Sequence, residues 1–186
     1  MLQGQLTNAF SKSSSLVTLD LSHNQFNGTI PYWTDKLSQL NYLILTNNSF
    51  EGEEETIDVS WKNMSYTTYK GVTLTLIYGI DLSCNNLMGK IPPQIGNLTK
   101  IVTLNLSHNR LTGFIPKTFS NLKKIQSLDL SYNNLNGNIP PELVELNSLS
   151  AFNVAHNNLS GKTLGQTEKF ITLGESSYEG NYFLCG

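Results

Sequence analysis

The sequence predicts an α/β solenoid, in which short repeats stack side by side along one array. The first observation is that copies of the pattern L-x-x-L-x-L-x-x-N-x-L-x-G-x-I-P begin at Leu16, Leu40, Ile77, Ile101, Ile125 and Leu149. The second is their spacing, which is 24 residues at each step except the 37 residues from Leu40 to Ile77. A unit this short cannot bury its apolar face alone, so consecutive copies must stack and share one core.

Each repeat is expected to begin with a β-strand on the concave face of the array. In the copy that starts at Ile125, residues 127–131 alternate polar and apolar side chains, which is the period of a strand. Leu128 and Leu130 should face the core, whereas Asp129 and Ser131 should face solvent. Stacked copies predict a parallel sheet with about 4.8 Å between neighbouring strands.

An asparagine follows each strand where the chain must turn. Its buried amide can satisfy backbone groups that the turn leaves unpaired, and stacked copies should form a ladder. The ladder positions are Asn24, Asn48, Asn85, Asn109, Asn133 and Asn157. Beyond it, Gly137 permits a backbone conformation closed to other residues, and Pro140 fixes an extended segment. The connections are too short for α-helices, so turns and short 3-10 helices should line the convex face of a right-handed horseshoe arc.

The period divides the chain into four parts. Residues 1–52 hold repeats, the first of them partial, since Leu2, Gly4 and Leu6 lie 24 positions before their counterparts. Residues 53–76 form an insert, residues 77–164 hold four repeats, and residues 165–186 form a C-terminal capping segment. Because the chain starts in mid-repeat, we expect it to be part of a longer protein or the product of a truncated gene.

Composition argues against several kinds of partner and against catalysis. Charged residues make up 14% of the chain and the formal net charge is −2, so we expect neither nucleic acid nor an anionic membrane surface to bind. No stretch reaches the ~18 apolar residues of a membrane helix, and residues 1–6 do not resemble a signal peptide. Motifs for nucleophilic, phosphate, dinucleotide or metal chemistry are missing, so we expect a non-catalytic protein without a cofactor.

The histidines and the aspartates of the strands are interpreted as surface residues. His23, His108 and His156 each precede a ladder asparagine. His108 and His156 are two repeats apart, or about 10 Å at strand spacing, which is too far to share a metal ion. The aspartates lie on a flat open sheet that suggests no pocket, and they are Asp20, Asp81 and Asp129.

Glycosylation sequons point to the secretory pathway. The motif N-x-S/T occurs at Asn27, Asn47, Asn63, Asn97, Asn105 and Asn158. Asn105 should point out of the concave sheet, where a glycan would mask part of that face. The two cysteines give little evidence on redox environment: Cys84 is expected to be a partly buried thiol, and the partner of Cys185 is expected beyond the end of the chain.

The insert is the least repetitive segment of the chain. It carries Trp61, Tyr66 and Tyr69, interleaved with Lys62 and Lys70. Irregular loops on a regular scaffold often carry binding residues, and aromatic side chains are common interface anchors. Two interpretations stay open, since these rings either contact a ligand or pack the insert against the solenoid.

The repeats resemble the leucine-rich repeats of plant cell-surface receptors, as seen in Thr103–Pro116 and Leu128–Pro140. More narrowly, the chain resembles the C-terminal part of plant receptor-like proteins. That resemblance rests on Tyr69-Lys70-Gly71 in the insert, Tyr78–Ser83 after it, four repeats, and an ending with Ser177–Asn181 and Leu184–Gly186. It covers nearly the whole chain.

The resemblance implies perception of extracellular signals, in defence or development, at the outer side of the plasma membrane. It implies that an extracellular peptide, protein or glycan ligand contacts insert residues Trp61, Tyr66, Tyr69 and Lys70. It further implies that a co-receptor leucine-rich-repeat kinase faces the concave residues Thr103, Asn105, Ser127, Asp129, Ala151 and Asn153. Such proteins lack a kinase domain and signal by associating with kinases. The parent protein would carry the membrane anchor, so the chain itself should not contact the membrane.

Three alternatives remain at this stage. A secreted inhibitor of a microbial wall-degrading enzyme uses similar repeats, although uninterrupted arrays are usual there. The ectodomain of a receptor kinase would differ only in downstream sequence. A truncated gene product would expose an open solenoid end and tend to aggregate.

Overall fold

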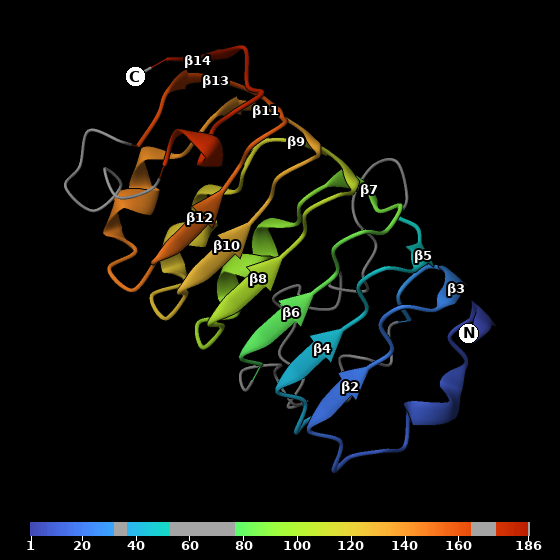
Figure 1. Cartoon of the computed structure of the whole chain (residues 1–186). Coiled ribbons are helices and arrows are strands. Elements are labelled where there is room, and N and C mark those ends of the chain that lie inside the picture. Colours follow the sequence, from blue (N-terminus) through green and yellow to red (C-terminus); the bar gives the residue numbers. More distant parts are fainter. Residues whose placement is uncertain (32–36, 53–76, 165–173, 186) are drawn as a thin grey trace.

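The computed structural model describes residues 1–31, 37–52, 77–164 and 174–185, which form a solenoid. Each complete repeat adds one strand to a six-stranded parallel sheet of order β12-β10-β8-β6-β4-β2, here called the main sheet (Figure 1). Its strands are β2 (Thr18–Asp20), β4 (Tyr42–Ile44), β6 (Gly79–Asp81), β8 (Thr103–Asn105), β10 (Ser127–Asp129) and β12 (Ala151–Asn153). The predicted solenoid and its concave-face sheet are confirmed.

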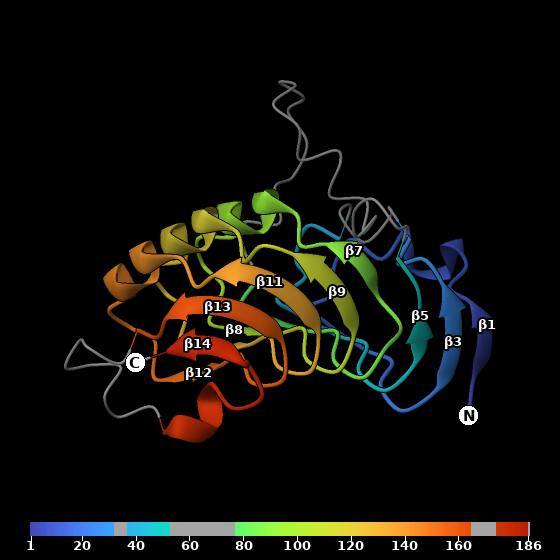
Figure 2. The ribbon, with the colours of Figure 1, turned by 90° about the horizontal axis from the view of Figure 1, so that it is seen from above.

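A second layer of parallel strands, which the sequence predicted only as extended segments, follows the ladder turns (Figure 2). One sheet has the order β1-β3-β5 and the other β14-β13-β11-β9-β7. Their bounds are β1 (Gln3–Gln5), β3 (Gln25–Gly28), β5 (Ser49–Phe50), β7 (Met88–Lys90), β9 (Arg110–Gly113), β11 (Asn134–Asn138), β13 (Asn158–Lys162) and β14 (Phe183–Cys185). We call these strands together the second layer. At most one side chain per strand is fully buried in the core, so local alternation gives a weak signal.

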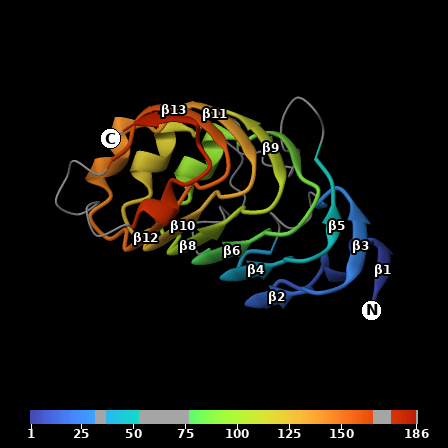
Figure 3. The same cartoon turned by 45° about the horizontal axis from the view of Figure 1, so that its top comes forward.

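Short 3-10 helices cover the face opposite the main sheet, as the connection lengths predicted (Figure 3). They are η1 (Asn8–Phe10), η4 (Pro93–Asn97), η5 (Lys117–Asn121) and η6 (Pro141–Glu145). A further short helix, η8 (Glu175–Ser177), lies instead beside β12 of the main sheet. Pro93 and Pro141 lie in the first turn of their helices, where the fixed φ of proline suits helix entry. In the part of the chain that the structure describes, every helix is of this 3-10 type and none could span a bilayer.

The ladder asparagines tie each rung of the solenoid to the one before it. Asn133 is buried, and its Oδ1 accepts a hydrogen bond from the Leu111 backbone N–H of the preceding rung at 2.9 Å. Its Nδ2 donates to the Leu106 carbonyl of that rung at 3.0 Å, and to the Leu130 and Ser131 carbonyls of its own turn at 3.1 Å each. One amide therefore satisfies four backbone groups and fixes the spacing of two rungs.

The insert does not interrupt this stacking. β4 pairs with β6 directly, with Leu43 opposite Ile80. Asn85 accepts from Phe50 N–H at 3.0 Å and donates to the Leu45 carbonyl at 3.0 Å, although 35 and 40 residues separate the partners. The stack of rungs is therefore continuous past the insert, and residues 53–76 are an addition between two consecutive rungs.

A seventh ladder residue, Asn181, lies in the segment that was expected only to cap the array. Its Oδ1 accepts from Leu159 N–H at 3.0 Å, and its Nδ2 donates to the Val154 carbonyl at 3.0 Å. β14 continues the second layer against β13. Asn181 stands 24 residues after Asn157, so the period held the signal for this extra turn.

The prediction that Ser131 faces solvent was wrong. Ser131 is only 2% exposed, and the equivalent Ser83 and Ser107 are buried as well. The Ser131 hydroxyl is held within the turn, where it donates to Asp129 Oδ1 at 2.7 Å. These serines therefore complete the turn rather than contribute to the solvent-facing surface.

Replacing Asn133 by alanine should lower the free energy of unfolding by about 1–3 kcal/mol, because buried backbone groups lose their partner. Urea denaturation followed by circular dichroism measures the change. Asn134→Ala is the matched control, since Asn134 is the same residue type one position later and is exposed. Equal midpoints for both variants would contradict the role of the ladder.

Candidate functional site

The face of the main sheet that points away from the core carries two columns of side chains. The first column holds Thr18, Tyr42, Gly79, Thr103, Ser127 and Ala151. The second holds Asp20, Ile44, Asp81, Asn105, Asp129 and Asn153. Three of these twelve residues are acidic and none is basic, so the face favours a cationic partner surface.

The second column also has a structural task that the sequence did not reveal. Asp129 Oδ1 accepts from the Ser131 backbone N–H at 2.9 Å and from its hydroxyl at 2.7 Å. Asp81 does the same with Ser83 (3.0 and 2.6 Å), and Asn105 with Ser107 (3.0 and 2.8 Å). One side-chain oxygen of each residue thus closes the turn, which leaves the second carboxylate oxygen of each aspartate for solvent or a partner.

Four of the six predicted co-receptor-facing residues line one hollow of about 450 Å³ at the C-terminal end of the main sheet. They are Ser127, Asp129, Ala151 and Asn153, joined there by Gly174, Ser176 and Ser177. The far wall is held in place because the Ser177 carbonyl accepts a hydrogen bond from Val154 N–H at 2.9 Å. Thr103 and Asn105 lie on β8, one strand away from β10. The hollow therefore brings together two rungs and the segment after them.

Tyr42 is an exposed aromatic residue of the first column that the sequence interpretation missed. It is 44% exposed, and its ring lies over Gly79 on the next strand. A Cβ at Gly79 would stand 2.7 Å from Tyr42 Cδ1, so only glycine accommodates the ring in this position. Position alone could have found Tyr42, because it occupies the same outward strand site as Ser127.

The three histidines belong to an exposed ridge of turn residues that precede the ladder asparagines. Every non-glycine member has a positive φ, from 51° to 57°. His108, Tyr132 and His156 stack, with ring centroids 4.2 Å apart at both steps. The predicted surface placement of the histidines is confirmed. Cys84 also lies on this ridge and is exposed, so its predicted partial burial was wrong, because the turn directs its side chain outward.

The described part of the chain places five of the six sequons. Asn27, Asn47, Asn97 and Asn158 are exposed, and Asn105 is half-buried on the main sheet. Asn63 lies outside the described residues, as do the predicted ligand-facing residues Trp61, Tyr66, Tyr69 and Lys70. Within the described ranges, no group of three or more His, Cys, Asp or Glu residues could hold a metal ion.

Comparisons with known proteins agree with this architecture. Leucine-rich-repeat family models match residues 15–37, 75–135 and 99–159, together more than half of the chain. "Receptor-like protein 32" from Arabidopsis thaliana is 32% identical over 99 residues, which cover 45% of this chain and 11% of that protein. The chain thus spans about a tenth of the length of this curated relative.

Solved structures of plant receptors superpose on nearly the whole chain. The plant peptide hormone receptor RGFR1, in complex with RGF2, has a TM-score of 0.82 and 31% identity, covering 98% of this chain and 27% of the receptor. The Arabidopsis receptor kinase HAESA, in complex with the peptide hormone IDA and the co-receptor SERK1, has a TM-score of 0.70 and 30% identity, covering 98% and 32%. The fold and repeats define a leucine-rich-repeat solenoid. The chain belongs to the leucine-rich-repeat family, and its repeats are similar to those of plant receptor-like proteins and plant receptor ectodomains.

Replacing Ser22 by alanine should raise the pKa of Asp20. Hydrogen bonds from Ser22, first from its side chain and then from its backbone N–H, hold the pKa of Asp20 below its ordinary value. Since the folded-state pKa is lowered, this contribution to stability is present above the unfolded-state pKa and is lost as pH falls through the folded-state pKa. A carboxyl-carbon NMR titration measures both proteins, and an unchanged pKa would refute the assignment.

Proposed function

We propose that the chain is a ligand- and co-receptor-binding module of a plant cell-surface receptor-like protein, which perceives extracellular signals in defence or development. It acts by assembly with other proteins and carries out no catalysis. The observation that carries the proposal is the hollow at the C-terminal end of the main sheet, where Ser127, Asp129, Ala151 and Asn153 converge.

The co-receptor surface comprises the last rungs of the main sheet. Its outward side chains are short, so a partner can approach the strands closely. The aspartates of the second column favour a cationic patch on the partner, which would also speed association. The receptor kinase HAESA was solved with a peptide hormone and the co-receptor SERK1, and its structure matches 98% of this chain. By this likeness, the partner is the ectodomain of a co-receptor leucine-rich-repeat kinase.

The ligand surface comprises the insert together with the neighbouring rungs. Trp61, Tyr66, Tyr69 and Lys70 supply aromatic and cationic contacts from the insert. Tyr42 adds an exposed ring on β4, the last strand of the main sheet before the insert. The ligand is an extracellular peptide, protein or glycan, and the module stands on the outer side of the plasma membrane within a longer, anchored protein.

Replacing Ala151 by arginine should weaken binding to a co-receptor ectodomain at least tenfold, because a long cationic side chain would fill the hollow. Biolayer interferometry with the purified ectodomain of a SERK-type kinase measures the affinity. Thr18→Arg is the matched control, since Thr18 occupies the same column at the opposite end of the main sheet. Equal affinities for both variants would contradict the proposed location, and no binding by the unmodified folded chain would contradict the function.

Replacing Trp61 and Tyr69 together by alanine should weaken ligand capture while leaving the circular dichroism spectrum unchanged. The measurement is retention of the secreted chain on immobilised plant or microbial extracts, compared with the unmodified chain. Unchanged retention with a native spectrum would contradict the ligand role of the insert.

A further inference from the structure

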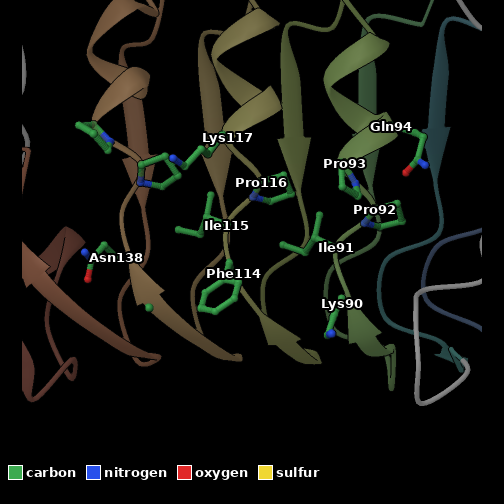
Figure 4. A pocket seen from close by; sticks show the side chains of 13 residues that line it. Lys90, Ile91, Pro92, Pro93, Gln94, Phe114, Ile115, Pro116, Lys117 and Asn138 are labelled. Carbon is green, nitrogen blue, oxygen red and sulfur yellow. The ribbon is translucent and has the colours of Figure 1, made fainter.

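A groove of about 840 Å³ crosses three rungs where the chain passes from the second layer to the 3-10 helices (Figure 4). Its walls are the repeated turns Ile91–Pro93, Ile115–Lys117 and Pro140–Pro141. It lies away from the face of the main sheet, between β7, β9 and β11 on one side and η4, η5 and η6 on the other. The volume falls within the usual range of small-molecule sites, about 300–1,000 Å³.

Phe114 is the feature that distinguishes this groove from an ordinary row of turns. It is 68% exposed, yet its ring lies against Gly137 of the next rung, so closely that a Cβ there would lie 2.4 Å from Phe114 Cδ1. The equivalent Lys90 and Asn138 cover Gly113 and Gly161 in the same way. A polar side chain therefore suffices to cover the glycine, and the fold does not require an aromatic ring at this position.

The surroundings of Phe114 are apolar and rigid. Pro92, Pro93, Pro116, Pro140 and Pro141 all line the groove. Proline rings lose almost no side-chain entropy when a ligand covers them. A flat apolar body between these rings and Phe114 would therefore bury surface at little ordering cost.

The charges at the groove are of one sign. Lys90 and Lys117 are the only charged side chains among the residues that line it. Lys117 has one acidic neighbour, Glu142, at 3.6 Å, and the Lys117 side chain is 78% exposed, so this pair is weak. In Figure 4, Lys90 lies near Phe114 on the strand side of the groove, and Lys117 lies on the helix side.

From these observations we infer that the groove is a binding site for a small organic anion with a flat apolar body, such as an aromatic carboxylate. The apolar body lies on Phe114 and the proline rings. The anionic group is held by Lys90 or Lys117. The site lies on another surface from the proposed co-receptor hollow, so its test leaves the proposed function untouched.

The test uses 2-naphthoate and its uncharged analogue 2-naphthamide, titrated into the full chain by isothermal titration calorimetry at low salt. Naphthoate should bind saturably and more tightly than naphthamide. Phe114→Ala should weaken both ligands at least tenfold. The double variant Lys90→Gln with Lys117→Gln should weaken naphthoate at least fivefold and naphthamide less than twofold, since glutamine keeps the methylene that covers Gly113.

Phe183→Ala is the matched control, because Phe183 is 67% exposed on β14 and lies outside the groove. It should bind both ligands as the unmodified chain does. Absence of saturable binding, equal affinity for the acid and the amide, or equal losses in the two phenylalanine variants would each overturn the inference.

Discussion

The hydrogen bonding of the ladder asparagines is the interaction on which this structure depends. Burial of leucine side chains drives stacking, but apolar contact has no direction and does not set a register. The amide of Asn133 bonds to two backbone groups of the preceding rung and to two of its own turn. Because Asn85 makes equivalent bonds across the insert, a long added segment leaves the rungs in register. A solenoid held in this way can vary its outward residues without changing its frame.

The two columns of outward residues on the main sheet are not equally free to vary. The second column of the main sheet closes the strand-ending turns, so Asp81, Asn105 and Asp129 each commit one oxygen to the fold. The first column bears no such task and varies from Tyr42 through Gly79 to Ala151. Specificity on this face should therefore come mainly from the first column, with the second supplying three carboxylates, at Asp20, Asp81 and Asp129.

Two separate surfaces follow from the same repeat. The last rungs of the main sheet present short side chains and a hollow, which suits a protein partner. The turns between the second layer and the 3-10 helices present rigid proline rings, Phe114 and two lysines, which suits a small anion. Since the solenoid separates them, occupancy of one surface does not obstruct the other. The leucine-rich-repeat frame can thus serve two ligands of different size.

The period by itself determined the solenoid, the main sheet, the six ladder asparagines within the repeats and the short convex helices, because each depends on contacts repeated at constant spacing. The same period could also have predicted Asn181, which stands 24 residues after Asn157. Only the tertiary structure decided that Ser131 is buried, that the extended segments pair as a second layer, and that Ser127, Asp129, Ala151 and Asn153 meet segment 174–177 in one hollow. The groove at Phe114 was likewise hidden. These features depend on side chains from different rungs, whose directions a linear pattern does not specify.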